Sequence, residues 1–180
     1  MLAQRPGSLT FRSNPVTLVG PTLRIGYPAP EFRAVGADFT PVTLADTEIS
    51  IRLLLTVPSL DVPECDQVIR QFRTALQELG EVKLLVASMD LPFTHERWLN
   101  ANGSEGIRLL SDYQQSSLGQ AFGVLIKELH ILAQAVFIIN ERNRIAYSQY
   151  VREVTGAPDY TACLSALRLV VNSPLRRPGG

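Results

Sequence analysis

The sequence predicts an α/β fold in which a mixed central sheet is flanked by helices and preceded by a β-hairpin. The main observation is an apolar run at 51–57 that leads into residues 65–79, where apolar side chains recur at helical spacing. A second apolar run follows at 82–88. This order predicts two parallel strands joined by a helix in a right-handed crossover. With 46% hydrophobic and 19% charged residues, the chain can bury such a core.

Two hairpins are expected ahead of the first core strand. Short alternating runs at 9–12 and 16–19 surround Ser13-Asn14-Pro15, and residues 32–44 carry Gly36-Ala37-Asp38 near their centre. In the central helix, Pro63 suits the first helical position, and Gly80 suits the position after the last turn. Further along, the pattern predicts helices at 92–101, 117–122 and 158–171 and strands at 107–110, 131–139 and 145–151. We expect one domain over 1–180, with its core at about 8–171 and a mobile tail at 173–180.

The composition argues against several classes of function. Lys and Arg total 17 and balance 17 Asp and Glu, so the net charge does not favour nucleic acid or an anionic membrane as a partner. No apolar run reaches the roughly 18 residues of a membrane-spanning helix, and the N-terminus lacks the apolar segment of a secretion signal. The two cysteines, Cys65 and Cys163, favour a reducing cytoplasm over a secreted disulfide scaffold. Two distant histidines do not complete a metal site with them, so neither a metal nor another cofactor is expected.

Cys65 is the candidate reactive residue. It follows the buried 51–57 strand and stands in the first turn of the predicted helix. Free N–H groups and the positive end of the helix dipole favour a thiolate at such a position, which lowers a thiol's pKa. The alternative is an inherited cysteine that only packs at the helix start.

Five segments, in the right order, resemble the bacterial thiol peroxidases. This group is an atypical two-cysteine branch of the peroxiredoxins with a thioredoxin-like fold. The resemblance covers roughly residues 8–171. The segments are Phe11-Arg12-Ser13-Asn14-Pro15-Val16-Thr17, Pro58-Ser59-Leu60-Asp61, Asp90-Leu91-Pro92-Phe93, and Tyr147-Ser148-Gln149 followed by Pro158-Asp159-Tyr160.

The resemblance implies four chemical groups at the site, of which this chain keeps two. Cys65 falls on the peroxidatic cysteine, and Pro58 falls on the proline that shields it. Val62 stands where the family has a Thr or Ser hydroxyl. Gln134, on the expected strand at 131–139, takes the position of an arginine, and Leu99 takes that of the resolving cysteine.

These replacements predict a low rate of reaction between Cys65 and a peroxide. In the family a thiolate attacks the peroxide O–O bond, while the hydroxyl and the guanidinium bind the thiolate and the peroxide. Hydrogen bonds to charged groups contribute roughly 1.5–3 kcal/mol each. Losing two of them costs roughly 3–6 kcal/mol, or about two to four decades in rate. Glu64 beside the thiol further disfavours the thiolate if its carboxylate points that way.

Several side chains leave alternatives open at this stage. Arg70 or Arg97 could send a guanidinium toward Cys65 and replace part of the lost charge. Cys163 could act as a resolving cysteine, although a buried free cysteine more often packs as a small apolar residue. His95, on a helix expected to be exposed, is interpreted as a solvated surface residue, with a replacement base or ligand as the alternative.

Two functions from different classes follow. The first is a thiol peroxidase-like peroxiredoxin that reduces hydrogen peroxide or alkyl hydroperoxides through Cys65 alone, with thioredoxin or a small thiol as reductant. The second is a catalytically silent protein in which Pro58, Val62, Cys65 and Gln134 line a less polar pocket for a small ligand or a partner side chain. By the same resemblance, a homodimer through the active-site face is expected in both cases.

Overall fold

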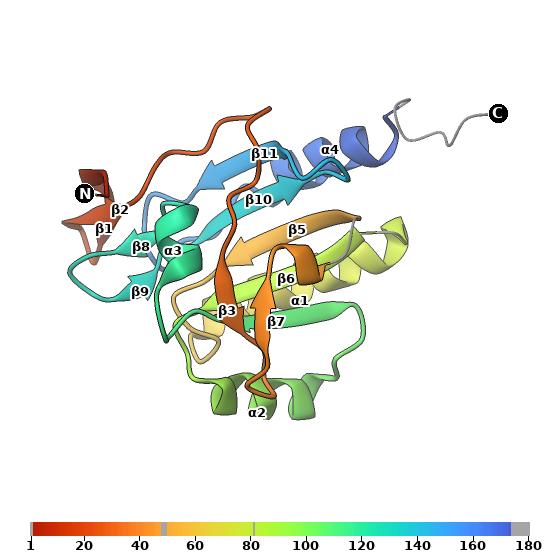
Figure 1. Cartoon of the computed structure of the whole chain (residues 1–180), viewed down its shortest axis with the longest axis horizontal. Coiled ribbons are helices and arrows are strands. Elements are labelled where there is room, and N and C mark those ends of the chain that lie inside the picture. The colour runs from red at the N-terminus through yellow and green to blue at the C-terminus, as the bar shows by residue number, and fades with distance from the viewer. Residues whose placement is uncertain (1, 48–49, 81, 174–180) are drawn as a thin grey trace.

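The structure, a computed structural model, describes residues 2–47, 50–80 and 82–173 (Figure 1). The expected tail at 173–180 lies outside the described residues from position 174 onward. Four α-helices are described: α1 (Pro63–Leu79), α2 (Pro92–Asn102), α3 (Ser117–Ala121) and α4 (Tyr160–Val171), with a short 3-10 helix at Ala45–Thr47. The strands are β1 (Gln4–Phe11), β2 (Asn14–Val19), β3 (Arg33–Val35), β4 (Pro41–Thr43), β5 (Ile51–Thr56), β6 (Val82–Ser88), β7 (Ile107–Ser111), β8 (Leu125–Ile126), β9 (Ile131–Leu132), β10 (Ala135–Ile139) and β11 (Ile145–Tyr150).

A seven-stranded mixed sheet forms the centre of the molecule, in the order β11-β10-β5-β6-β7-β3-β4. The predicted strand–helix–strand unit is present, because β5 pairs in parallel with β6 from Ile51–Val82 to Thr56–Ala87. Strand β5 lies at the middle of the sheet and all six of its residues are buried. Such a strand is covered on both faces, which explains its continuous apolar run. The predicted α/β fold with a mixed central sheet is confirmed.

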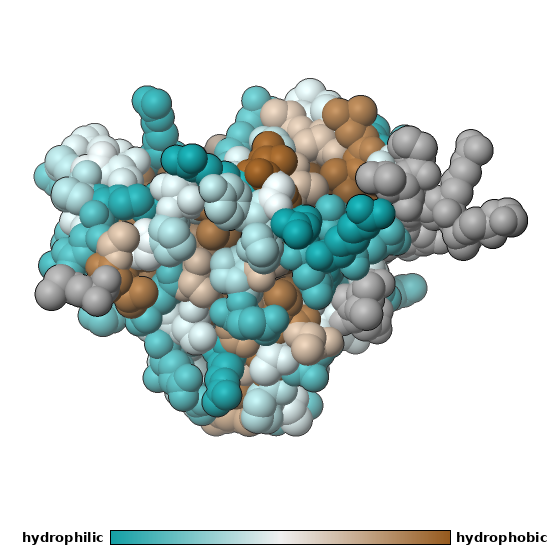
Figure 2. Space-filling model, turned by 45° about the horizontal axis from the view of Figure 1, so that its top comes forward, coloured by the Kyte–Doolittle hydropathy of each residue, from teal (hydrophilic) through white to brown (hydrophobic). Residues whose placement is uncertain are grey.

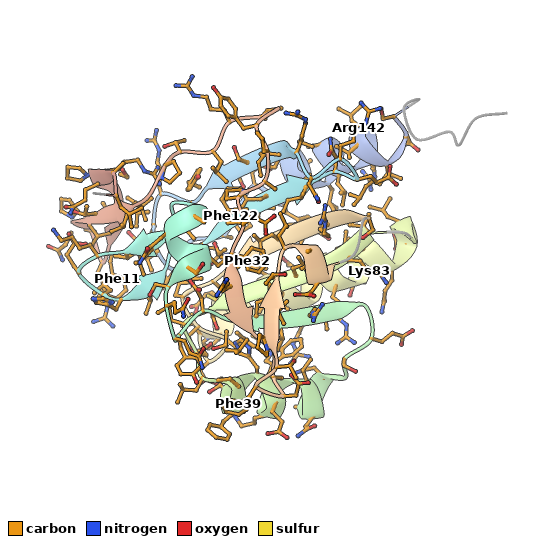
Figure 3. The ribbon with its side chains drawn as sticks, viewed as in Figure 1. Phe11, Phe32, Phe39, Lys83, Phe122 and Arg142 are labelled. Carbon is orange, nitrogen blue, oxygen red and sulfur yellow. The ribbon has the colours of Figure 1, made fainter. Side chains whose placement is uncertain are left out.

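The two faces of this sheet are covered differently. Helices α1, α2 and α4 cover one face, where Val68, Ile69 and Phe72 of α1 pack with residues such as Leu53 and Leu55 of β5. The other face packs against α3 and the N-terminal segments. Phe32 and Phe122, which are labelled in Figure 3, begin an edge-to-face chain of rings that continues through Phe137 to Tyr150. Cys65 belongs to the first layer.

The N-terminal hairpin is confirmed, and it belongs to a second sheet that was not predicted. Strands β1 and β2 pair antiparallel and continue through β8 and β9 into a four-stranded sheet. The tight turn is at Arg12 and Ser13, both with positive φ, one position earlier than the sequence indicated. A two-residue turn of this kind matches the right-handed twist of the flanking strands. The hairpin of β3 and β4 is also present, as predicted.

The prediction of one continuous strand over 131–139 is wrong. Strand β9 ends at Leu132 in the small sheet, and β10 begins at Ala135 in the large sheet. Ala133 and Gln134 form the crossing between them. All residues from Leu132 to Ile139 are buried, so the apolar run does not reveal the break. This crossing carries Gln134 into the candidate site.

On the face seen in Figure 2, hydrophobic side chains form separate patches among hydrophilic ones. No helix in the described part of the chain combines the length and the apolar character needed to cross a bilayer.

Candidate functional site

The site is built on the turn between β5 and α1. Pro58 is buried two residues after the end of β5, and Val62 is the N-cap residue of α1. Pro63 occupies the start of the helix, as predicted, where its missing N–H breaks no helical bond. The first helical hydrogen bond runs from the Asp66 N–H to the Val62 carbonyl, 3.0 Å. Cys65 therefore lies in the opening turn of α1, where backbone N–H groups have no helical acceptor.

The Cys65 thiol is fully buried within the α1 layer, with 0% of the residue exposed. Burial raises the pKa of the Cys65 thiol to about 11, and the nearby charges of Glu64 and Asp90 act in the same direction. The backbone of Ser59 opposes this shift through a hydrogen bond, but its effect is smaller. At neutral pH about one thiol in ten thousand is then ionised. The helix start alone does not produce a thiolate here.

Gln134 provides the side-chain hydrogen-bond partner of the thiol. The distance from Cys65 Sγ to Gln134 Oε1 is 3.7 Å, and both residues are completely buried. The nitrogen of the same side-chain amide, Gln134 Nε2, is buried and has no partner. The structure thus brings Gln134 to Cys65, as the sequence interpretation required, although from a crossing segment and not from a strand.

Val62 and Leu99 contribute apolar contacts at the positions where, by the resemblance, the family has a hydroxyl and a second thiol. Both are partly buried and pack against the hydrophobic layer that contains Cys65. Helix α1 has no side-chain cap, because valine at the N-cap offers no acceptor to the free N–H groups. Both cysteines of the described chain are free.

The alternative that Arg70 or Arg97 replaces the missing charge is not supported. Arg70 Nε lies 2.9 Å from Asp66 on the exposed side of α1. Arg97 forms an exposed ion pair with Asp61. Each guanidinium is paired with a carboxylate that neutralises it, and exposed pairs of this kind contribute little beyond about 1 kcal/mol.

Asp90 holds the turn that precedes Cys65, a role that the sequence interpretation missed. Its Oδ1 accepts a hydrogen bond from Ser59 Oγ at 2.8 Å, and its Oδ2 accepts one from the Leu60 N–H at 2.8 Å. Oδ2 also accepts from Ser88 Oγ at 2.9 Å, at the end of β6. One carboxylate therefore ties the β5–α1 turn to the end of the neighbouring strand. Its place in Asp90-Leu91-Pro92-Phe93, directly after a buried strand, was the available signal.

His95 was predicted to be a solvated surface residue, and this prediction is wrong. It is completely buried, and its Nε2 lies 2.9 Å from Ser88 Oγ. Because the Ser88 hydroxyl donates to Asp90, its oxygen accepts from His95, which makes Nε2 the protonated nitrogen. The remaining nitrogen, Nδ1, is buried without a partner. Burial lowers the pKa of His95 to about 4, with the Asp90 charge acting the other way.

Cys163 lies on α4 and contacts residues of β11. Its Sγ is 3.7 Å from the Tyr147 hydroxyl and 3.6 Å from Gln149 Oε1. Burial raises the pKa of this thiol to about 11. These contacts fit the interpretation of Cys163 as a buried core residue. Within the described residues, no group of three His, Cys, Asp or Glu side chains is arranged to hold a metal ion.

Comparisons with known proteins identify the family of this chain. Residues 25–148 match the model of the AhpC/TSA family. A thiol peroxidase of Halalkalibacterium halodurans is 42% identical over 161 residues, which is 89% of this chain and 97% of that protein. A thiol peroxidase of Bacillus subtilis is 38% identical over 163 residues, covering 91% of this chain and 98% of the relative.

A solved structure shows the same fold. The peroxiredoxin-like protein from Aquifex aeolicus superposes with a TM-score of 0.83 at 34% identity, over 94% of this chain and 98% of that one. The fold and the site thus define a peroxiredoxin of the thioredoxin-like class. The chain belongs to the AhpC/TSA family and, within it, to the thiol peroxidase branch.

Proposed function

We propose that this chain is a thiol peroxidase-like peroxiredoxin that reduces hydrogen peroxide or alkyl hydroperoxides through Cys65, in one-cysteine chemistry and at a low rate. The observation that carries the proposal is the retained position of Cys65, buried in the first turn of α1 and seven residues after Pro58 in the chain. The sulfur would attack one peroxide oxygen, so that an S–O bond forms and the O–O bond breaks. The products are the sulfenic acid of Cys65 and water or an alcohol.

The low rate follows from what surrounds the sulfur. Gln134 offers a neutral amide where the resemblance implies a guanidinium, and Val62 offers no hydroxyl. The raised pKa of Cys65 leaves little thiolate to react. Since Leu99 occupies the position of the second thiol, an external thiol must attack the sulfenic acid, release water and leave a mixed disulfide that a second thiol reduces. Thioredoxin or a small thiol is proposed as this reductant.

Two further parts of the proposal concern context. A homodimer is proposed from the resemblance to thiol peroxidases. A cytoplasmic location is proposed because two buried thiols, Cys65 and Cys163, suit a reducing compartment.

The rate is tested by stopped-flow oxidation with hydrogen peroxide, with an intact thiol peroxidase measured in parallel. We expect Cys65 to react about two to four decades more slowly than the intact enzyme. Cys65→Ser is the control that removes the reaction, and Cys163→Ser is the matched control that leaves it. A rate in the range of the intact enzyme would contradict the proposal of a slow site.

The second candidate is a catalytically silent protein that binds a small ligand or a partner side chain. The complete burial of Cys65 and the hydrogen bond of its S–H to Gln134 favour it, because both hold the thiol in its neutral form. Intact-mass spectrometry after addition of peroxide separates the two candidates. Stoichiometric gain of oxygen at Cys65 supports the peroxidase, and an unmodified thiol under excess peroxide supports the silent protein.

A further inference from the structure

Gln134 uses only one of the two hydrogen-bonding groups of its side-chain amide in its contact with Cys65. Its oxygen accepts the S–H, while its Nε2, with two N–H donors, stays buried and unpaired. A buried donor without an acceptor destabilises the folded chain, because the group has lost its hydrogen bonds to water. The resting thiol thus leaves one half of the Gln134 side chain unsatisfied.

Hydrogen bonds to the backbone carbonyls of Ala133 and Gln134 hold the main chain that carries the Gln134 side-chain amide. The Gln134 carbonyl accepts a hydrogen bond from the Val151 N–H at 3.0 Å. The preceding carbonyl, of Ala133, accepts one from Thr56 Oγ1 at 2.7 Å. Rotation of the side-chain amide about its last bond exchanges the oxygen and the nitrogen, so either group can face the sulfur.

From these contacts we propose that Gln134 stabilises the sulfenic acid of Cys65 and makes the oxidised state long-lived. This inference rests on the proposed function, because it requires that Cys65 reacts with peroxide. In the reaction, Cys65–SH and H2O2 give Cys65–SOH and H2O. An S–O bond forms and the O–O bond breaks, the sulfur is oxidised by two electrons, and the thiol proton leaves in the water.

The sulfenic acid complements the amide better than the thiol does. The oxygen of the sulfenic acid accepts a hydrogen bond from the Gln134 N–H2 group, and the O–H of the sulfenic acid donates one to the Gln134 amide oxygen. Val62 and Leu99 belong to the apolar surroundings of the site. Burial of this kind disfavours the charged sulfenate, which is the form of the sulfur that attacks a second peroxide. Leu99 also replaces the thiol that would consume the sulfenic acid within the chain. Cys65 then stays in the sulfenic acid state until an external thiol reduces it.

The lifetime of the sulfenic acid tests the proposal in the full chain. Cys65 is oxidised with one equivalent of hydrogen peroxide, excess peroxide is removed, and a 1,3-dicarbonyl reagent traps the remaining sulfenic acid at successive times. Peptide mass spectrometry assigns the product to Cys65. Gln134→Met keeps the length of the side chain and removes both hydrogen-bonding groups. We expect this variant to shorten the lifetime roughly tenfold, because the hydrogen bonds from Gln134 to the sulfenic acid are lost.

The chain offers a matched control in Gln149→Met. Gln149 faces the other cysteine at a similar distance, 3.6 Å from Cys163 Sγ, and is expected to leave the lifetime at Cys65 unchanged. Equal lifetimes in the parent chain and in Gln134→Met would overturn the inference while leaving the proposed function intact. If Cys65 of the parent chain takes up no oxygen, the proposed function fails and the inference fails with it.

A second measurement needs no folded variant. In the 15N-labelled parent chain, the side-chain amide signals of Gln134 are compared between the reduced and the oxidised protein. We expect a downfield shift of the Gln134 amide protons and slower exchange with water on oxidation, with little change at Gln149. Signals of Gln134 that do not respond to formation of the sulfenic acid would overturn the inference, because a merely structural glutamine would behave in this way.

Discussion

At the scale of single residues, the chemistry of Cys65 is decided by burial and by neighbours that are neutral or acidic, namely Gln134, Glu64 and Asp90. A thiol in the first turn of a helix ordinarily gains from the helix dipole, by typically 0.3–1 kcal/mol. Here burial raises the pKa of Cys65 to about 11, and Glu64 and Asp90 add to the effect. With Gln134 in place of a cation, the helix start does not reverse this shift. The pKa of Cys65 should therefore change when Val62 and Gln134 are replaced.

The double variant Val62→Thr/Gln134→Arg is predicted to restore a reactive thiol. The guanidinium favours the thiolate, and the threonine adds a hydroxyl that can also cap α1 at its N-terminus. We expect the pKa of Cys65 to fall by two or more from about 11 and alkylation by iodoacetamide at pH 7 to become about a hundredfold faster. The pH dependence of the alkylation rate gives the pKa directly.

The double variant Val62→Ala/Gln134→Met serves as its control, since it changes the same positions without adding a polar group. Circular dichroism shows whether each variant folds. A Val62→Thr/Gln134→Arg protein that is folded but still titrates near pH 11 would show that burial alone, and not the missing groups, keeps Cys65 unreactive.

At the scale of elements, Asp90 is the connection that holds the turn before α1. Its carboxylate accepts from Ser59 Oγ, from the Leu60 N–H and from Ser88 Oγ, and so joins the β5–α1 turn to the end of β6. Asp90→Ala is predicted to lower the free energy of unfolding by roughly 2–4 kcal/mol, because three donors lose their acceptor. Urea denaturation measures this change. Asp61→Ala, which removes an exposed partner of Arg97, should change it by less than about 1 kcal/mol.

His95 links helix α2 to the same network and should make stability depend on acidity. Its pKa in the folded chain is about 4, below the ordinary value of 6.5, so the unfolded chain binds more protons between these values. Stability should be complete above about pH 6.5 and should fall by roughly 2–3 kcal/mol as the pH drops to about 4. In His95→Gln, which keeps a donor toward Ser88, this loss should be absent.

The measurement is the difference in unfolding free energy between the parent chain and His95→Gln at pH 4 and pH 7. A difference is needed because Asp112 acts in the opposite direction. Burial raises its pKa to about 6, so Asp112 makes the folded chain less stable as the pH rises from about 4 to about 6. Since Asp112 is present in both proteins, its contribution cancels. A difference that does not vary with pH would contradict the assignment of His95.

These elements also show what the sequence could and could not predict. Runs of apolar residues and the Pro63 and Gly80 boundaries were enough to place β5, α1 and β6, because the information is local. His95 was misplaced, although its spacing from Pro92 and Trp98, three residues on either side, marks the buried face of α2. A histidine is rarely buried without a polar partner, and the partner of His95 is Ser88 on another element. The sequence pattern of α2 alone does not reveal that partner.

At the scale of the whole molecule, the remaining errors come from contacts between distant segments. The run 131–139 is apolar throughout, yet it changes sheets at Ala133 and Gln134, because β9 pairs with β8 and β10 pairs with β5 and β11. Local periodicity contains no sign of this choice of partner. The same crossing directs Gln134 toward Cys65. The site therefore depends on a feature of the fold that sequence patterns alone do not reveal.

The homodimer is the prediction that belongs to this scale. Three large apolar side chains are exposed near the α2 end of the molecule: Leu91 at 49%, Phe93 at 64% and Phe39 at 43%. Phe39 and Phe93 stack edge to face with ring centres 5.0 Å apart, and Figure 3 shows Phe39 beside α2. Leu91 and Phe93 follow Asp90, which holds the Cys65 turn, so this apolar cluster lies on the chain next to the site. Exposed apolar groups of this size mark interaction surfaces.

We expect the parent chain to sediment as a dimer and Phe93→Glu to sediment as a monomer, because the charge must be buried if the second copy covers this cluster. Leu169→Glu is the matched control. Leu169 is a large apolar residue exposed to 75% on α4, and its substitution should leave the dimer intact. Sedimentation velocity over a range of concentrations distinguishes the outcomes. A dimer that survives Phe93→Glu but is lost in Leu169→Glu would place the interface on α4 and remove it from the face that carries the Cys65 turn.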